Sequence, residues 1–343
     1  MIKLAFVYDL VWDCREVGQE MRDGLERLMR SYMAFESWRL TDGDGNNFQL
    51  AEATAGLFFA GLLQDHPLTE RFLSGTNGLY ELTGAVFADD GSYFEGATGY
   101  MRLAAEILLQ AAVALENMEM NFKELYVAAS YDKNIIHAPW AVREGASGKG
   151  RPFLGMSFAR DRAVERPMRR LRDYLDMLRR MLNPWGILFS ANDSNEQDFS
   201  VIMETAAYVY QDPSYLAGKG GSILYGPHML ESRSGGYLRK DGLPNTLQDL
   251  DRYGSILNYG NGFGILRENG EKEPVQAVLK FGQHGGYHGH FDRLSLMSFM
   301  RGNRTFHNNE YAWYGYDSFL FKMWVQTSMA HNMTVVDCRM QRP

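Results

Sequence analysis

The spacing of apolar residues changes character along this 343-residue chain, and that change constrains the fold more than any other feature. In the first two-thirds, apolar residues recur at steps of three and four, the pattern of helices that bury one face. In the last third they alternate with polar residues, which is typical of strands. Helices that precede strands, rather than mix with them, predict an α+β fold with segregated layers.

Gly-rich turns separate the segments that carry these two patterns. The helical pattern covers residues 17–33, 50–64, 99–117, 167–182 and 196–210. The strand pattern covers residues 275–281, 294–300 and 333–336. We therefore expect a helical domain over residues 1–235, followed by an antiparallel β-sheet domain that starts within residues 236–343.

Composition excludes several classes of protein. With 45% hydrophobic and 22% charged residues, the chain is not a long disordered one. Lys and Arg number 35 against 42 Asp and Glu, a net charge of −7, which opposes a general nucleic-acid binder. A polyanionic ligand would then need a local basic cleft. The chain contains no run of about 18 apolar residues, the length that would predict a membrane span. Its two cysteines lie far apart in the sequence and predict no disulfide framework.

Histidines are concentrated near the C-terminus. Five of the eight fall between residues 284 and 331. If His288 and His290 lie on one strand, they share a face, because side chains repeat every two residues. Paired imidazoles suit a metal, or a metal ligand beside a catalytic base. The alternative is a glycine-rich hairpin whose histidines are simply exposed.

Two polar segments open predicted helices. The loop over residues 90–100 reads Asp-Gly-Ser-Tyr-Phe-Glu-Gly and continues to Tyr100, so Glu95 and Tyr100 are candidates for exposure at a helix N-terminus. Asn46 and Asn47 stand before another apolar helix. Taken alone, either segment is accounted for more simply by helix capping.

Together these segments resemble the heparinase II/III-like polysaccharide lyases, a family related to heparinases and oligoalginate lyases. The matching segments keep the family order and are Asn46-Asn47, Asp90–Tyr100, His288–Asp292, Gly302–Asn308 and Ala330–Asp337. The resemblance implies an α+β chain with an incomplete (α/α) toroid of helix pairs and the first strands of an antiparallel β-sheet. It also implies an internal piece of a longer lyase, from a family that is usually periplasmic or secreted.

The resemblance further implies cleavage of an acidic, uronic-acid-containing polysaccharide, glycosaminoglycan-like or alginate-like, by β-elimination. The C5 proton is weakly acidic unless the uronate carboxylate is neutralised. Asn47, or its neighbour Asn46, would neutralise it, Tyr100 would act as base or acid, and His288 would be the partner base or position the sugar. The residues expected to contact the sugar chain are Asn46, Gln49, Glu52, Glu95, Tyr311, Tyr314 and Tyr316.

A structural zinc ion, without an organic cofactor, is also implied by the resemblance. Its ligands would be His290, His331 and the residue at the family's aspartate position, which counting from Gly302 makes Asn308. A neutral amide is a weak zinc ligand, and His307 or Asp292 could take its place. Several family members carry a histidine where this chain has Phe48-Gln49, which favours an asparagine as the neutralising group.

Two other functions remain open at this point. One is a non-catalytic carbohydrate-binding relative, suggested by Asn308 and by a sheet of few strands. The other is a toroid glycoside hydrolase that uses paired carboxylates such as Glu95 and Asp193. That chemistry needs two acids within about 5–10 Å of each other. The local pattern of residues 192–195 is otherwise that of a capping loop.

Overall fold

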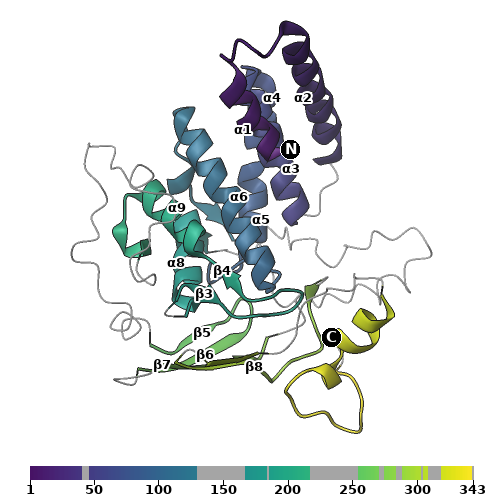
Figure 1. The fold of residues 1–343 in the computed structure, drawn as a ribbon, viewed down its shortest axis with the longest axis vertical. Coiled ribbons are helices and arrows are strands. Elements are labelled where there is room, and N and C mark those ends of the chain that lie inside the picture. The colour runs from purple at the N-terminus through teal and green to yellow at the C-terminus, as the bar shows by residue number, and fades with distance from the viewer. Residues whose placement is uncertain are drawn as a thin grey trace.

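The computed structural model places a layer of helices over an antiparallel β-sheet (Figure 1). The helices come first along the chain and the sheet follows, so the predicted α+β class is confirmed. The boundary predicted between residues 235 and 236 lies outside the described residues. The structure describes residues 1–40, 46–129, 167–183, 185–216, 254–269, 274–282, 288–302, 304–307 and 318–341.

The helices reproduce the segments with helical spacing and add shorter ones. They are α1 (Ile2–Val11), α2 (Gln19–Arg39), α3 (Asn47–Leu62), α4 (His66–Leu73), α5 (Leu79–Val86), α6 (Thr98–Asn117), α8 (Leu171–Met181) and α9 (Ser200–Tyr210). Within the described residues, no helix is long and apolar enough to cross a bilayer. Further on, a π-helical turn covers Phe321–Val325.

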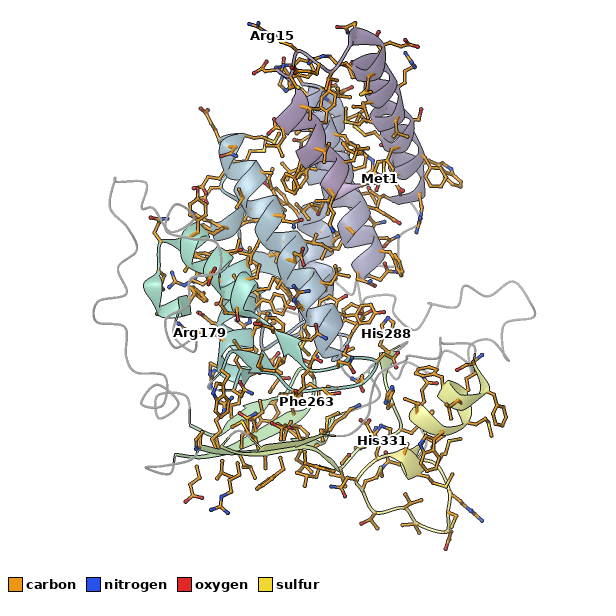
Figure 2. All side chains as sticks on the ribbon, in the orientation of Figure 1. Met1, Arg15, Arg179, Phe263, His288 and His331 are labelled. Atoms are coloured by element: carbon orange, nitrogen blue, oxygen red, sulfur yellow. The ribbon has the colours of Figure 1, made fainter. Side chains whose placement is uncertain are left out.

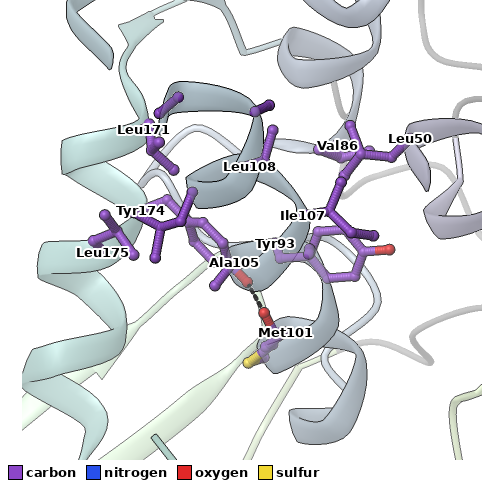
Figure 3. Packing of buried hydrophobic residues seen from close by; sticks show 14 of the residues in the cluster. Leu50, Val86, Tyr93, Met101, Ala105, Ile107, Leu108, Leu171, Tyr174 and Leu175 are labelled. Carbon is purple, nitrogen blue, oxygen red and sulfur yellow. Dashed lines mark hydrogen bonds between the residues drawn. The ribbon is translucent and has the colours of Figure 1, made fainter. Parts of the chain in front are cut away.

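Helix α6 is packed against α3, α8 and α9. It turns small and apolar side chains to these neighbours, including the buried Ala104, Ala105 and Leu108. Across from it, the hydroxyl of Tyr174 on α8 donates to the backbone oxygen of Met101 at 2.6 Å (Figure 3). A buried tyrosine needs such a partner, so this bond fixes α8 against the N-terminal turn of α6.

Helices α3 and α4 approach each other closely at a glycine. A Cβ atom on Gly56 would collide with the ring of Phe72. Both ends that face the preceding loops are capped by side chains: Asn46 accepts from the backbone N–H of Gln49, and Asp65 accepts from that of Leu68. These bonds satisfy N–H groups that a helix start leaves unpaired.

The main sheet is an antiparallel meander in which each strand pairs with the next along the chain. Its strands are β5 (Ile256–Asn258), β6 (Phe263–Asn269), β7 (Pro274–Lys280), β8 (Ser295–Arg301) and β9 (Arg304–His307). Two-residue pairs also occur, namely β1 (Val127–Ala128) with β2 (Met168–Arg169) and β3 (Ile187–Leu188) with β4 (Gln197–Asp198). The sheet lies under the lower ends of the helices (Figure 1).

The buried face of β7 carries polar side chains. Gln276, Val278 and Lys280 are buried, while Leu279 is exposed on the opposite face. A register shift follows Val278, where β7 pairs with β8. The strand thus brings a lysine under the helical layer, which requires a buried partner for its charge.

The strand predicted over residues 333–336 is wrong. The structure has no strand there, although the backbone N–H of Leu296 at β8 donates to the oxygen of Asn332 at 3.0 Å. Directly after this segment, Asp337 and Cys338 adopt left-handed backbone angles, with φ of 53° and 52°. Left-handed residues do not continue an extended strand, and Val336 is 70% exposed rather than packed.

Candidate active site

A cluster of three histidines and one aspartate lies where the helical layer meets the sheet. Figure 2 labels His288 beside the lower end of α6 and His331 further down, on the C-terminal segment drawn in yellow. One oxygen of Asp193 lies 3.0 Å from Nδ1 of His288, and its other oxygen lies 2.7 Å from Nε2 of His290. Nδ1 of His290 lies 3.1 Å from Nε2 of His331. All four residues are buried.

The loop between β3 and β4 positions the aspartate. Asn192, just before Asp193, has a left-handed φ of 54°. The Asn192 side-chain oxygen accepts from the backbone N–H of His290 at 3.3 Å and from Nζ of Lys280 at 2.5 Å. The backbone N–H of Asp193 donates to the oxygen of His288 at 3.3 Å. Bonds to two sheet segments therefore hold this loop of the helical layer.

Hydrogen bonding determines which nitrogens of the cluster carry protons. A carboxylate and a carbonyl oxygen only accept. Nε2 of His290 must therefore donate to Asp193, and Nδ1 of His331 must donate to the backbone oxygen of Thr327, 2.7 Å away. In their neutral forms, the two remaining nitrogens, 3.1 Å apart, both carry lone pairs. Facing lone pairs repel, so a proton or a metal ion has to lie between them.

This arrangement fits the zinc ligands expected at His290 and His331. Zinc binds the bare nitrogen of an imidazole whose other nitrogen donates to a carboxylate or a backbone carbonyl, and both rings have that second bond. The expected third ligand, Asn308, lies outside the described residues, as does the side chain of His307. Over the described part of the chain, no group of three or more His, Cys, Asp or Glu residues suits a metal.

Tyr100 packs directly on His288. Their ring centroids are 3.7 Å apart, and the ring planes differ by 19°. Tyr100 lies in the first turn of α6, and that turn is tied to the Asp193 loop because the N–H of Gly99 donates to Oγ of Ser194 at 2.8 Å. A Cβ atom on Gly99 would lie 2.9 Å from that oxygen, so glycine permits the approach. The structure brings Tyr100 and His288 together, while their catalytic roles stay predictions.

Glu95 lies beside this pair but is 2% exposed. It accepts a hydrogen bond from the hydroxyl of Tyr93 at 3.1 Å. The pKa of Glu95 is raised above its ordinary value, first by burial and also by the charge of Asp193. His288 and the hydrogen bond from Tyr93 act in the opposite direction. In the structure, the hydrogen-bonding partner of Glu95 is thus a buried tyrosine. Its contact with a sugar chain stays a prediction.

The polar segment predicted to open a helix at Asn46 and Asn47 lies at the start of α3. Asn46 caps α3, and Asn47 and Gln49 are buried in the first turn of that helix. Glu52, one turn further, forms an ion pair of 2.8 Å with Arg39 on α2. The role of Asn47 as neutralising group stays a prediction. Tyr311, Tyr314 and Tyr316 lie outside the described residues.

Glu36, a buried acid on α2, lies close enough to Glu52 to affect its charge. Burial, with a contribution from Glu36, raises the pKa of Glu52 to about 7, although Arg39 lowers it. Burial also raises the pKa of Glu36. Folding therefore makes both acids easier to protonate than they are in the unfolded chain.

We expect Glu52→Gln to flatten the pH dependence of stability. The folded-state pKa lies above the unfolded value of about 4.3, so protonation of Glu52 favours the fold. That contribution is fully present below about pH 4 and is lost as the pH rises through about 7. Glutamine stays neutral, so from about pH 5 to about pH 8 the variant's Tm should fall less than that of the unaltered protein. Thermal denaturation over that range measures the change in Tm.

The matched control for Glu52→Gln is Glu106→Gln, which alters a more exposed acid paired with Arg102. An equal effect of both variants on the pH dependence of Tm would contradict the raised pKa of Glu52.

Sequence reasoning missed a buried ion pair beside the cluster. Nζ of Lys280 bonds the carboxylate of Asp292, and their side chains are 2% and 0% exposed. Asp292 was an alternative metal ligand by sequence, but this oxygen pairs with a lysine. Its second oxygen is buried without a hydrogen-bond partner among the described residues. The only sequence signal was a lysine at a buried position of a strand.

Similar solved structures are heparinases. A crystal structure of heparinase III matches with a TM-score of 0.58 at 13% identity, covering 96% of this chain and 45% of that one. A heparinase III gene product with methylated lysines gives 0.57 at 12%, covering 96% and 42%. Another structure of a heparinase III gene product gives 0.51 at 14%, covering 82% and 36%.

These likenesses show the fold. The chain resembles the helical toroid and antiparallel strands of heparinase III and spans less than half the length of each of these structures. The sequence matches no protein-family model and no curated protein. At 12–14% identity, the resemblance confirms a heparinase-like fold and leaves the reaction to be argued from the site.

Proposed function

We propose that this chain carries the active site of a polysaccharide lyase that cleaves a uronic-acid-containing polysaccharide by β-elimination. The observation that carries the proposal is the Tyr100 ring stacked at 3.7 Å on His288, whose Nδ1 is bonded to Asp193. A candidate acid and a candidate base are thus in contact, on a fold that resembles heparinase III.

In the proposed reaction, Nε2 of His288 takes the proton from C5 of the uronate. The bond between C4 and its oxygen breaks as a double bond forms between C4 and C5, and the Tyr100 hydroxyl gives a proton to the leaving oxygen. Water is not consumed. The Asn47 amide would donate to the uronate carboxylate, which gains charge as the C5 proton leaves.

The hydrolase alternative loses support from the same contacts. A hydrolase of this kind needs a carboxylate that acts on water or on the sugar. In Asp193, one oxygen is occupied by His288 and the other by His290. Glu95 is buried and bonded to Tyr93. Both oxygens of Asp193 are therefore engaged by imidazoles, so this residue lacks a free oxygen for that chemistry.

Absorbance measurements on a panel of uronate polymers test the proposal. β-Elimination creates an unsaturated uronide, so near-ultraviolet absorbance should rise with at least one of heparan sulfate, chondroitin sulfate, hyaluronan or alginate. A neutral glucan is the control and should give no rise. If no polymer gives a rise, the lyase is contradicted; polymer binding without cleavage would then indicate the carbohydrate-binding relative.

A zinc ion held by Nδ1 of His290 and Nε2 of His331 is part of the proposal, with Asn308 as the expected third ligand. Its chemistry would be structural, since it would tie two segments of the sheet domain together. We expect about one zinc per chain by elemental analysis. His331→Ala should lower that content and the Tm, whereas the exposed His66→Ala should change neither. If the protein binds no zinc even at saturating zinc, the zinc site is contradicted, and His290 and His331 share a proton instead.

A further inference from the structure

One carboxylate serves two histidines in this site. The side chain of Asp193 is 0% exposed, and each of its oxygens faces a different imidazole, one at 3.0 Å and one at 2.7 Å. The two rings present different nitrogens to it: His288 presents Nδ1 and His290 presents Nε2. The aspartate therefore contacts both the candidate base and a candidate metal ligand.

These contacts impose opposite tautomers on the two rings. A carboxylate can only accept hydrogen bonds, so His288 carries its proton on Nδ1 and His290 carries its proton on Nε2. In the neutral rings, the nitrogens that carry no proton are Nε2 of His288 and Nδ1 of His290. In His290 that bare nitrogen faces His331 at 3.1 Å.

We propose that Asp193 is the positioning residue of this site, because it sets the tautomers of His288 and His290 together. Its consequence for turnover rests on the proposed lyase function, since Nε2 of His288 can act as a base only while it lacks a proton. For His290, the same carboxylate makes Nδ1 the nitrogen that faces His331, across a metal ion or a shared proton. One side chain thus prepares both halves of the cluster.

The surrounding bonds keep Asp193 between the rings. Its own N–H donates to the backbone oxygen of His288, and the neighbouring Asn192 accepts from the N–H of His290. Lys280, paired with Asp292, donates to the same Asn192 oxygen. The loop that carries Asp193 is therefore bonded on both sides to the segment that carries the two histidines.

Nuclear magnetic resonance of the imidazole nitrogens tests this directly. Two-dimensional proton–nitrogen spectra of the unaltered protein should show His288 protonated on Nδ1 and His290 on Nε2. Single His→Gln variants assign the signals. The opposite tautomer at either residue overturns the proposal, and this measurement needs no substrate.

The variant Asp193→Asn provides a second test of the proposal. An amide has one accepting oxygen and one donating nitrogen, so it can hold only one of the two rings in its original tautomer. We expect the bare and protonated nitrogens of one histidine to exchange their chemical shifts. Asp198→Asn, on an exposed residue of β4 just after the same loop, should change neither ring. Unchanged tautomers at both histidines in Asp193→Asn would overturn the proposal.

Measurements of turnover distinguish a failure of this inference from a failure of the proposed lyase function. If the protein is a lyase and His288 is the ring that switches, kcat should fall by about 10⁴-fold, the size of effect seen when an aspartate-held histidine takes the wrong tautomer. KM should change little, because Asp193 is fully buried and does not reach the sugar. A protein without lyase activity but with the expected tautomers would contradict the function and support the role of Asp193.

Discussion

Tyr100→Phe and His288→Ala should each abolish lyase turnover while the protein stays folded. Positioned acids and bases typically contribute about 10²- to 10⁴-fold to a rate, and each variant removes one of them. Phenylalanine keeps the ring that stacks on His288 and loses only the hydroxyl. Initial rates of absorbance increase on the best uronate polymer measure turnover, and circular dichroism melting measures folding.

Matched controls separate chemistry from packing. Tyr126→Phe removes the hydroxyl of an exposed tyrosine that lies under Arg170, and His66→Ala removes an exposed histidine. Both should retain normal rates. Near-normal turnover in Tyr100→Phe would show that Tyr100 is not the acid, and His288 would then need another partner for the leaving oxygen.

Lys280→Met should destabilise the fold by about 3–5 kcal/mol, the usual cost of removing one partner of a buried ion pair. The substitution leaves the carboxylate of Asp292 buried, with its side chain 0% exposed, and without its cation. It also removes the donor to Asn192. Urea denaturation measures the change in the free energy of unfolding.

Two comparisons check that explanation. Arg30→Met breaks a partly exposed ion pair with Asp65 and should cost less than about 1 kcal/mol. The double variant Lys280→Met with Asp292→Leu removes both charges and should recover much of the lost stability. A double variant that is as unstable as Lys280→Met alone would show that the cost comes from packing rather than from an uncompensated charge.

Sequence patterns predicted the long elements well because these elements depend on periodic burial. The helix predicted over residues 99–117 is α6, Thr98–Asn117, and the strand predicted over residues 294–300 is β8, Ser295–Arg301. Short elements such as α4 and α5 offer too few turns for a period to stand out. The false strand at residues 333–336 shows that local alternation does not guarantee a pairing partner.

The alternation in β7 identified a strand but not which face is buried. Its inward face carries Gln276 and Lys280 rather than its more apolar neighbours. Such a face is stable only because residues far away in sequence, Asn192 and Asp292 among them, satisfy the lysine. Partners of that kind are set by tertiary contacts, which a local pattern does not contain.

The site was predicted in part. The histidine-rich segment and Tyr100 were identified, and the structure places His290 beside His331 and Tyr100 against His288. The central role of Asp193 was missed because its surroundings read as an ordinary capping loop. A carboxylate that bridges two imidazoles from a segment about a hundred residues away leaves no local signature.

The masses of the products from one defined uronate oligosaccharide test the central claim most directly. β-Elimination divides the substrate without adding water, so the two product masses should sum to the mass of the substrate, and one product should carry the unsaturated uronide. Product masses that exceed that sum by one water would instead identify a hydrolase and contradict the lyase.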